Sequence, residues 1–91
     1  MPSREFFFAV DLPSEISPSL VRELVRRVHD GVCSAPGGAA ELAELVEAAL
    51  ADAGAQGIAA FELRFEVQGG ELDVTVRAGS RPVWQTSRPI D

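Results

Sequence analysis

Residues 61–76 constrain the fold most, because apolar and polar residues alternate on both sides of the pair Gly69-Gly70. Two glycines can take the positive φ angles that a two-residue hairpin turn needs. Counting outward from this turn places apolar residues opposite one another. The expected pairs are Val67 with Leu72, Phe65 with Val74 and Leu63 with Val76. One face of the hairpin is therefore apolar throughout, and other elements must cover it.

An amphipathic helix is expected before this hairpin, over residues 39–53. Its apolar residues recur at helical spacing and form one stripe, which comprises Leu42, Leu45, Val46, Ala49, Leu50 and Ala53. Glutamates occupy the opposite side, where solvent and the helix dipole account for them without a catalytic role. Gly54 and Gly57 are predicted to end the helix.

The N-terminal part predicts a strand and another helix. Alternation over residues 5–12 places Phe6, Phe8, Val10 and Leu12 on one face of the strand and Phe7 on the other. Ser17 and Pro18 form a helix start, and Gly31 is predicted to stop the helix after Asp30. The apolar stripe of this helix is Leu20, Val21, Leu24, Val25 and Val28, and Glu23 and Arg27 form an i,i+4 pair on its polar side.

Residues 83–86 can form a last strand, which Pro82 and Pro89 confine to a sheet edge. The predicted order is strand, helix, helix, strand, strand, strand, and no linker is long enough to divide the chain. We therefore expect residues 1–91 to form a single α+β domain. Its predicted architecture is a two-layer sandwich, with two helices on one face of a mainly antiparallel sheet of three to four strands.

Composition excludes several kinds of partner. The net charge is −6, and all eight basic residues are arginines. Binding to duplex nucleic acid or to an anionic membrane is therefore not expected. The absence of lysine excludes a Schiff base and a P-loop lysine. A single cysteine, Cys33, and the short apolar run near the N-terminus favour a cytoplasmic protein.

Few residues offer chemistry. His29 and Cys33 are four residues apart, but Gly31 lies between them and no further ligand completes a zinc site, so neither a metal nor a cofactor is expected. Large aromatic residues and arginines are enriched at protein interfaces. The candidate partner-binding residues are Phe7, Arg77, Arg81 and Trp84.

Residues 45–57, followed by the hairpin and the AGS turn, resemble the anti-sigma-factor serine kinases of the histidine-kinase-like (GHKL, or Bergerat) ATPase fold. The resemblance covers roughly residues 5–82. In that family the second helix carries a glutamate, an asparagine, a histidine and a small residue, and an aspartate and two glycines follow the hairpin. The corresponding residues here are Ala48, Asp52, Gln56, Gly57, Ala78, Ser80 and Pro82. Only Gly57 matches, so the resemblance implies a shortened relative without the family's nucleotide chemistry.

Two functional hypotheses follow. The preferred one is a non-catalytic regulatory or protein-interaction module that binds a protein partner or a second copy of itself as a homodimer. The resemblance implies transcription or stress signalling, with a sigma factor or its antagonist as partner. The alternative is a small nucleotide-binding, kinase- or ATPase-like enzyme with a divergent magnesium site. There Glu47 and Asp52 would hold the cation and Arg77 or Arg81 would contact the nucleotide, although carboxylates five apart do not share a helix face.

Overall fold

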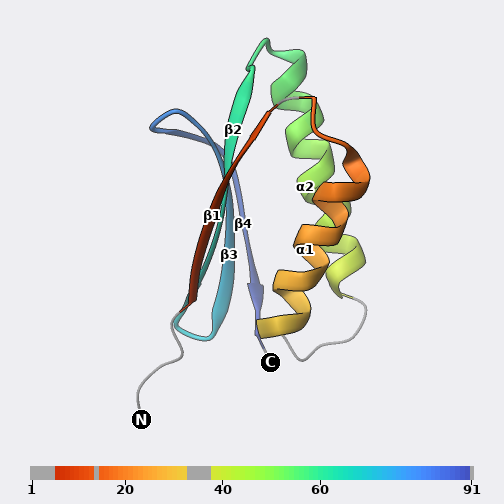
Figure 1. Ribbon diagram of the computed structural model, residues 1–91. Helices are drawn as coiled ribbons and strands as arrows, with labels where there is room; N and C mark the ends of the chain where they lie inside the picture. The colour runs from red at the N-terminus through yellow and green to blue at the C-terminus, as the bar shows by residue number, and fades with distance from the viewer. Residues whose placement is uncertain (1–5, 14, 33–37, 91) are drawn as a thin grey trace.

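Four strands and two helices make up the computed structural model, which describes residues 6–13, 15–32 and 38–90 (Figure 1). The elements are β1 (Phe6–Pro13), α1 (Pro18–Val32), α2 (Gly38–Ala55), β2 (Ala60–Gln68), β3 (Glu71–Ala78) and β4 (Arg81–Pro89). The strands form one antiparallel sheet in the order β1-β2-β3-β4, and both helices lie on the same face of it. The predicted two-layer α+β sandwich is confirmed.

The hairpin of β2 and β3 has the predicted register. Val67 pairs with Leu72, Phe65 with Val74 and Leu63 with Val76, and all six side chains are buried. Gly69 and Gly70 adopt φ angles of 58° and 80°, as a tight turn of this kind requires. The apolar face of the hairpin therefore forms the sheet side of the core.

The two helices cover this core, and β1 extends the sheet beneath them. The residues with no exposed surface include Val25 of α1, Leu42, Ala43 and Val46 of α2, and Leu63, Phe65, Leu72, Val74 and Val76 of the hairpin. Leu12 is the buried residue of β1, whereas Val10 is half-buried and Phe8 is 36% exposed. Burial thus decreases along β1 towards its N-terminal end. The side chain of Phe6 lies outside the described part of the chain.

Two predicted helix ends are wrong. Helix α1 continues through Gly31 to Val32, and α2 continues through Gly54 to Ala55. A glycine inside a helix costs only about 0.5–1 kcal/mol, which the packing of neighbouring residues can outweigh. Gly57 does end α2, because it has a φ of 87° and the Gly57 N–H donates to Gly54 O while the Ile58 N–H donates to Ala53 O.

The predicted helix stripes are correct in part. Leu20 is 61% exposed and Leu45 is 38% exposed, although both were assigned to the core. Ala43 of α2 and His29 of α1 are buried instead. Val21, Val25 and His29 are spaced by four residues, so the buried face of α1 is rotated away from Leu20. His29 therefore packs inside the protein, although the apolar stripe expected from the sequence did not include it.

The buried imidazole of His29 makes Gly38 sensitive to substitution. A Cβ added at Gly38 would lie 2.9 Å from His29 Nε2, whereas a Cβ at Gly54 would meet nothing within 4 Å. We expect Gly38→Ala to lower the free energy of unfolding by about 1–2 kcal/mol, because the ring must shift. The matched variant Gly54→Ala should raise it by about 0.5–1 kcal/mol. Urea denaturation followed by circular dichroism measures both, and a stabilised Gly38→Ala variant would contradict this packing.

Strand β4 is longer than predicted and lies at the sheet edge, as expected. Pro82 and Pro89 lie close to its two ends, and a register shift between Val76 and Arg77 marks a bulge against it. The other sheet edge is β1.

No helix within the described segments is long and apolar enough to cross a membrane.

Candidate interaction surfaces

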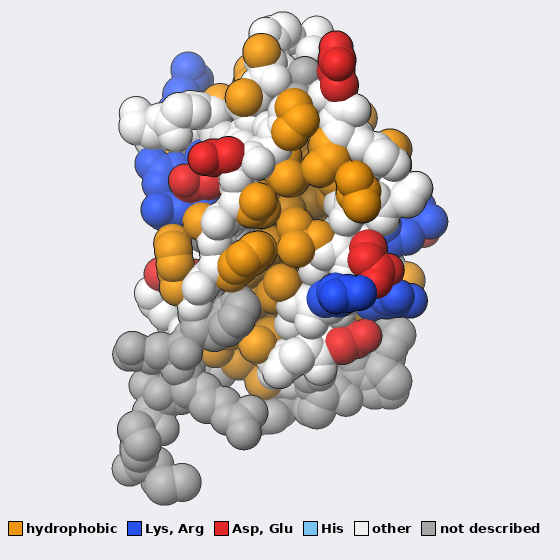
Figure 2. Space-filling view, viewed as in Figure 1, with side chains coloured by type: hydrophobic (Ala, Val, Ile, Leu, Met, Phe, Trp, Pro, Cys, Tyr) orange, Lys and Arg blue, Asp and Glu red, His pale blue; other side chains and the backbone are white. Residues whose placement is uncertain are grey.

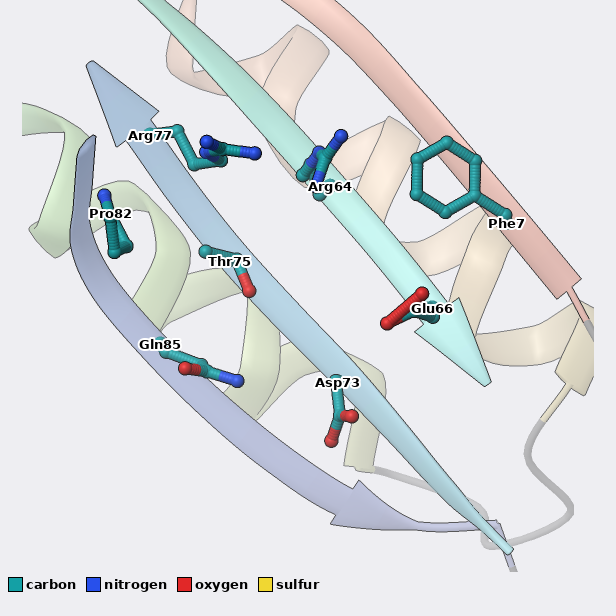
Figure 3. A pocket seen from close by; sticks show the side chains of 8 residues that line it. All are labelled: Phe7, Arg64, Glu66, Asp73, Thr75, Arg77, Pro82 and Gln85. Carbon is teal, nitrogen blue, oxygen red and sulfur yellow. The ribbon is translucent and has the colours of Figure 1, made fainter. Parts of the chain in front are cut away.

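The face of the sheet that the helices leave uncovered contains a shallow hollow of about 250 Å³ (Figure 3). Its lining comes from all four strands and comprises Phe7, Arg64, Glu66, Asp73, Thr75, Arg77, Pro82 and Gln85. We refer to this side as the open face. Most of its lining residues are polar or charged, so it offers hydrogen bonds and charges beside the apolar surface of Phe7 and Pro82.

The two arginines of the open face are already paired. Arg64 Nε lies 2.6 Å from Glu62 Oε1, and the Arg64 guanidinium lies 5.1 Å above the ring of Phe7. Arg77 Nη2 donates to Ser80 O at 2.7 Å, and its Nη1 is 4.0 Å from the same Glu62 oxygen. The two arginines therefore share the single carboxylate of Glu62, so one of their two positive charges is not balanced by it.

Two acidic residues face each other across the hairpin on this side, because Glu66 lies opposite Asp73 in the register. Arg64, which is close to them in β2, lies beside Glu62. Asp73 accepts a hydrogen bond of 2.6 Å from Ser87 Oγ of β4. The hydroxyl group thus supplies the local stabilisation of Asp73.

The predicted partner-binding residues do not form one surface. Phe7 and Arg77 line the same hollow, and Phe7 is 56% exposed. Arg81 is exposed at the start of β4. Trp84 lies opposite buried Val76, on the helix side of the sheet, where it is half-buried against the core. The structure therefore brings together two of the four predicted residues.

The residues of the alternative magnesium site are also apart. Glu47 of α2 accepts hydrogen bonds of 3.2–3.3 Å from Arg22 of α1, so its carboxylate links the two helices. Asp52 is exposed further along α2. Arg77 lies in the open-face hollow, in the other layer of the sandwich. Within the described segments, no three His, Cys, Asp or Glu residues could together hold a metal ion, and Cys33 falls outside them.

An apolar groove between β1 and α1 was not anticipated from the sequence. It has a volume of about 260 Å³, and its lining consists of Phe8, Leu24, Arg27, Val28, Gly31 and Val32. Figure 2 shows hydrophobic side chains that run as a band down the middle of this side of the molecule, with charged side chains on both flanks. Exposed Leu20 extends the groove, because it lies four residues before Leu24 on the same side of α1.

The helix side of this groove carries a small cluster of charges. Glu23 accepts hydrogen bonds from Arg27 Nε at 3.0 Å and from Arg26 Nη2 at 2.8 Å, so the predicted Glu23–Arg27 pair is confirmed. The hydrogen bond from Arg27, followed by the charge of Arg26, lowers the pKa of Glu23. Two arginines share one carboxylate here, and one positive charge remains beside the groove.

The two edges of the sheet differ in protection. Natural edge strands discourage pairing with other chains through prolines, bulges and charges. Strand β4 has prolines near both ends and a bulge. Strand β1 contains no proline before Pro13 and one charged residue, Asp11, and no strand within the described segments pairs with its outer side. We call this outer edge of β1 together with the adjoining groove the β1–α1 surface.

Comparisons with protein families, with curated proteins and with solved structures found no match to this chain.

Proposed function

We propose that the chain is a non-catalytic protein-interaction module, and that it binds a protein through the β1–α1 surface. One observation carries this proposal: the outer edge of β1, with which no strand of the described segments pairs, lies beside an apolar groove. The backbone of an edge strand can hydrogen-bond an added strand, while a neighbouring groove accepts the side chains of the binding partner. The β1–α1 surface offers both kinds of contact to the same partner.

Exposed apolar area supports this choice over the open face. Phe8 is 36% exposed beside the groove and Leu20 is 61% exposed at its end. Apolar patches flanked by charged residues are typical of protein-binding sites. On the open face, by contrast, Arg64 already covers the ring of exposed Phe7.

The resemblance to the anti-sigma-factor kinases extends this proposal to a regulatory role. On that basis, the module would act in transcription or stress signalling in the cytoplasm, with a sigma factor or its antagonist among the candidate partners. Its substitutions at Ala48 and Ala78 favour a role that needs no nucleotide. The pairing of Glu47 with Arg22 supports the same view, because it occupies a carboxylate that a magnesium site would require.

Site-specific photo-cross-linking tests the proposed surface. A benzophenone side chain at Phe8 is expected to capture a protein in cells that produce the chain, because the groove is covered when the module is bound. Leu45 is the matched control, since its exposure of 38% is close to the 36% of Phe8 but it lies on α2 outside the groove. Capture at Phe8 alone supports the proposal. Equal capture at both positions, or none at Phe8, would contradict it.

A further inference from the structure

We propose that the occupant of the β1–α1 surface is a second copy of this chain, with the two β1 strands paired antiparallel about a two-fold axis at Ala9. This inference rests on the proposed function and names its partner. The pairing would join the two sheets into one antiparallel sheet of about eight strands, and all helices would lie on one side of it. Three features of β1 and its neighbours lead to this register.

The first feature is steric. In an antiparallel pair centred on Ala9, the two Ala9 residues face each other on the open face, where a small side chain leaves the axis uncrowded. On the helix side, Phe8 lies opposite the second copy's Val10, so two apolar side chains contact each other on the face of the sheet that the helices cover. Side chains therefore match on both faces of the extended sheet.

The second feature is charge complementarity. Asp11 lies opposite Glu62 within the sheet, and it forms no ion pair with any residue that the structure describes. In the Ala9-centred register, Asp11 lies opposite the second copy's Phe7, over whose ring that copy's Arg64 is stacked. Small Ala9, the register partner of Arg64, leaves the path between these charges open. Each carboxylate thus gains an arginine, and the symmetry provides this pair twice.

The neighbouring registers fit less well. Centring the pair on Phe8 leaves Asp11 beyond the described end of the other strand. Centring it on Val10 places Asp11 opposite Ala9 and so also in line with Arg64 of the second copy, but it brings Val10 against Val10 at the axis on the helix side. Charge therefore disfavours the Phe8-centred pair, and the small side chain of Ala9 at the axis favours the Ala9-centred register.

The third feature is the groove itself. Helix α1 lies beside β1, so pairing of the two β1 strands brings the α1 helices together in antiparallel orientation across the axis (Figure 1). The stripe of Leu20, Leu24 and Val28 would then pack against the same stripe of the second copy. This contact covers the most exposed large apolar residue of the described chain, Leu20.

Sedimentation equilibrium of charge variants tests the inference. The unmodified chain should form a dimer, and Asp11→Arg should weaken dimerisation about tenfold because both symmetry-related pairs become repulsive. Arg64→Glu should weaken it as well, and the double variant Asp11→Arg/Arg64→Glu should recover most of the affinity. The matched control Asp73→Arg changes an acid on the same open face, but outside the pairing edge, and should leave the affinity unchanged.

A chain that remains monomeric at about 1 mM would overturn the inference, since even very weak complexes form at that concentration. Equal effects of Asp11→Arg and Asp73→Arg would overturn it too. Capture of a different protein by the photo-cross-linker at Phe8, with a monomeric purified chain, would keep the proposed function and exclude the second copy. If the affinity of the dimer does not change with Asp11→Arg and nothing is captured at Phe8, both the proposed function and the pairing through β1 are excluded.

Discussion

The variant Phe65→Ala is expected to lose about 3–5 kcal/mol of its free energy of unfolding. Phe65 has no exposed surface, lies in the middle of β2 and is the largest of the fully buried side chains. Alanine would leave a cavity between the sheet and the helices, and the ring of Phe8, 6.2 Å away, would lose its neighbour. A domain of this size has a total stability of about 5–14 kcal/mol, so the loss is a large fraction of it.

Urea denaturation of Phe65→Ala and of Phe7→Ala measures this contrast. Phe7 is the matched control, because it is also an aromatic residue of the sheet but is 56% exposed on the open face. Its truncation should cost less than about 1 kcal/mol, mainly through the lost contact with Arg64. Similar losses of unfolding free energy in the two variants would contradict the structure, because they would mean that the helices do not cover the face of the sheet that carries Phe65.

The second large effect is expected on association. Leu20→Glu places a charge where the apolar stripes of two α1 helices meet, at a position that is 61% exposed in the single chain. Folding should change by less than about 0.5 kcal/mol, since the substitution is on the surface. Dimerisation should weaken about tenfold for each copy and therefore about a hundredfold in a symmetric pair.

Leu45→Glu provides the control for this experiment. It introduces the same charge at an exposed leucine of α2, outside the groove, and should leave the dissociation constant within about twofold of that of the unmodified chain. Sedimentation equilibrium of the two variants gives the comparison. Equal weakening by both would indicate an effect of net charge, and no weakening by Leu20→Glu would exclude α1 from the interface.

The hairpin could be predicted to the residue, because two physical constraints agree there. Period-two alternation fixes which side chains share a face, and Gly69-Gly70 fixes where the turn lies. The order of the elements followed from the same change of period along the chain. The sequence pattern was therefore sufficient to predict the strands and the turn, where the conformation of one residue restricts the conformation of its neighbours.

The rotation of α1 could not be predicted, because its apolar stripe is wider than the face that the core accepts. Leu20 and His29 both border that stripe, and packing against β1 and α2 buries His29 and exposes Leu20. Helical spacing alone does not choose between them. The same limit applies to the helix ends at Gly31 and Gly54, where tertiary packing overrides a weak local preference.

The candidate surface was predicted only in part. Phe7 and Arg77 do lie together, but the groove was missed because Phe8, Leu24 and Val28 were all assigned to the core. How far a helix covers an edge strand depends on where the helix lies across the sheet, which the sequence does not specify. Three consecutive phenylalanines at the start of a strand at the sheet edge were the available signal, since one layer of helices cannot bury both faces.

The central claim is that a second copy completes the edge of β1, and a disulfide across the proposed axis tests it most directly. Residues directly opposite in an antiparallel pair have Cα atoms about 4.5–5.5 Å apart, a distance that a disulfide can bridge. With Cys33 replaced by serine, Ala9→Cys should therefore form a cross-linked dimer under mild oxidation, while Val10→Cys in the same background should remain largely monomeric. Cross-linking through Val10→Cys alone, or through neither variant, would contradict the account.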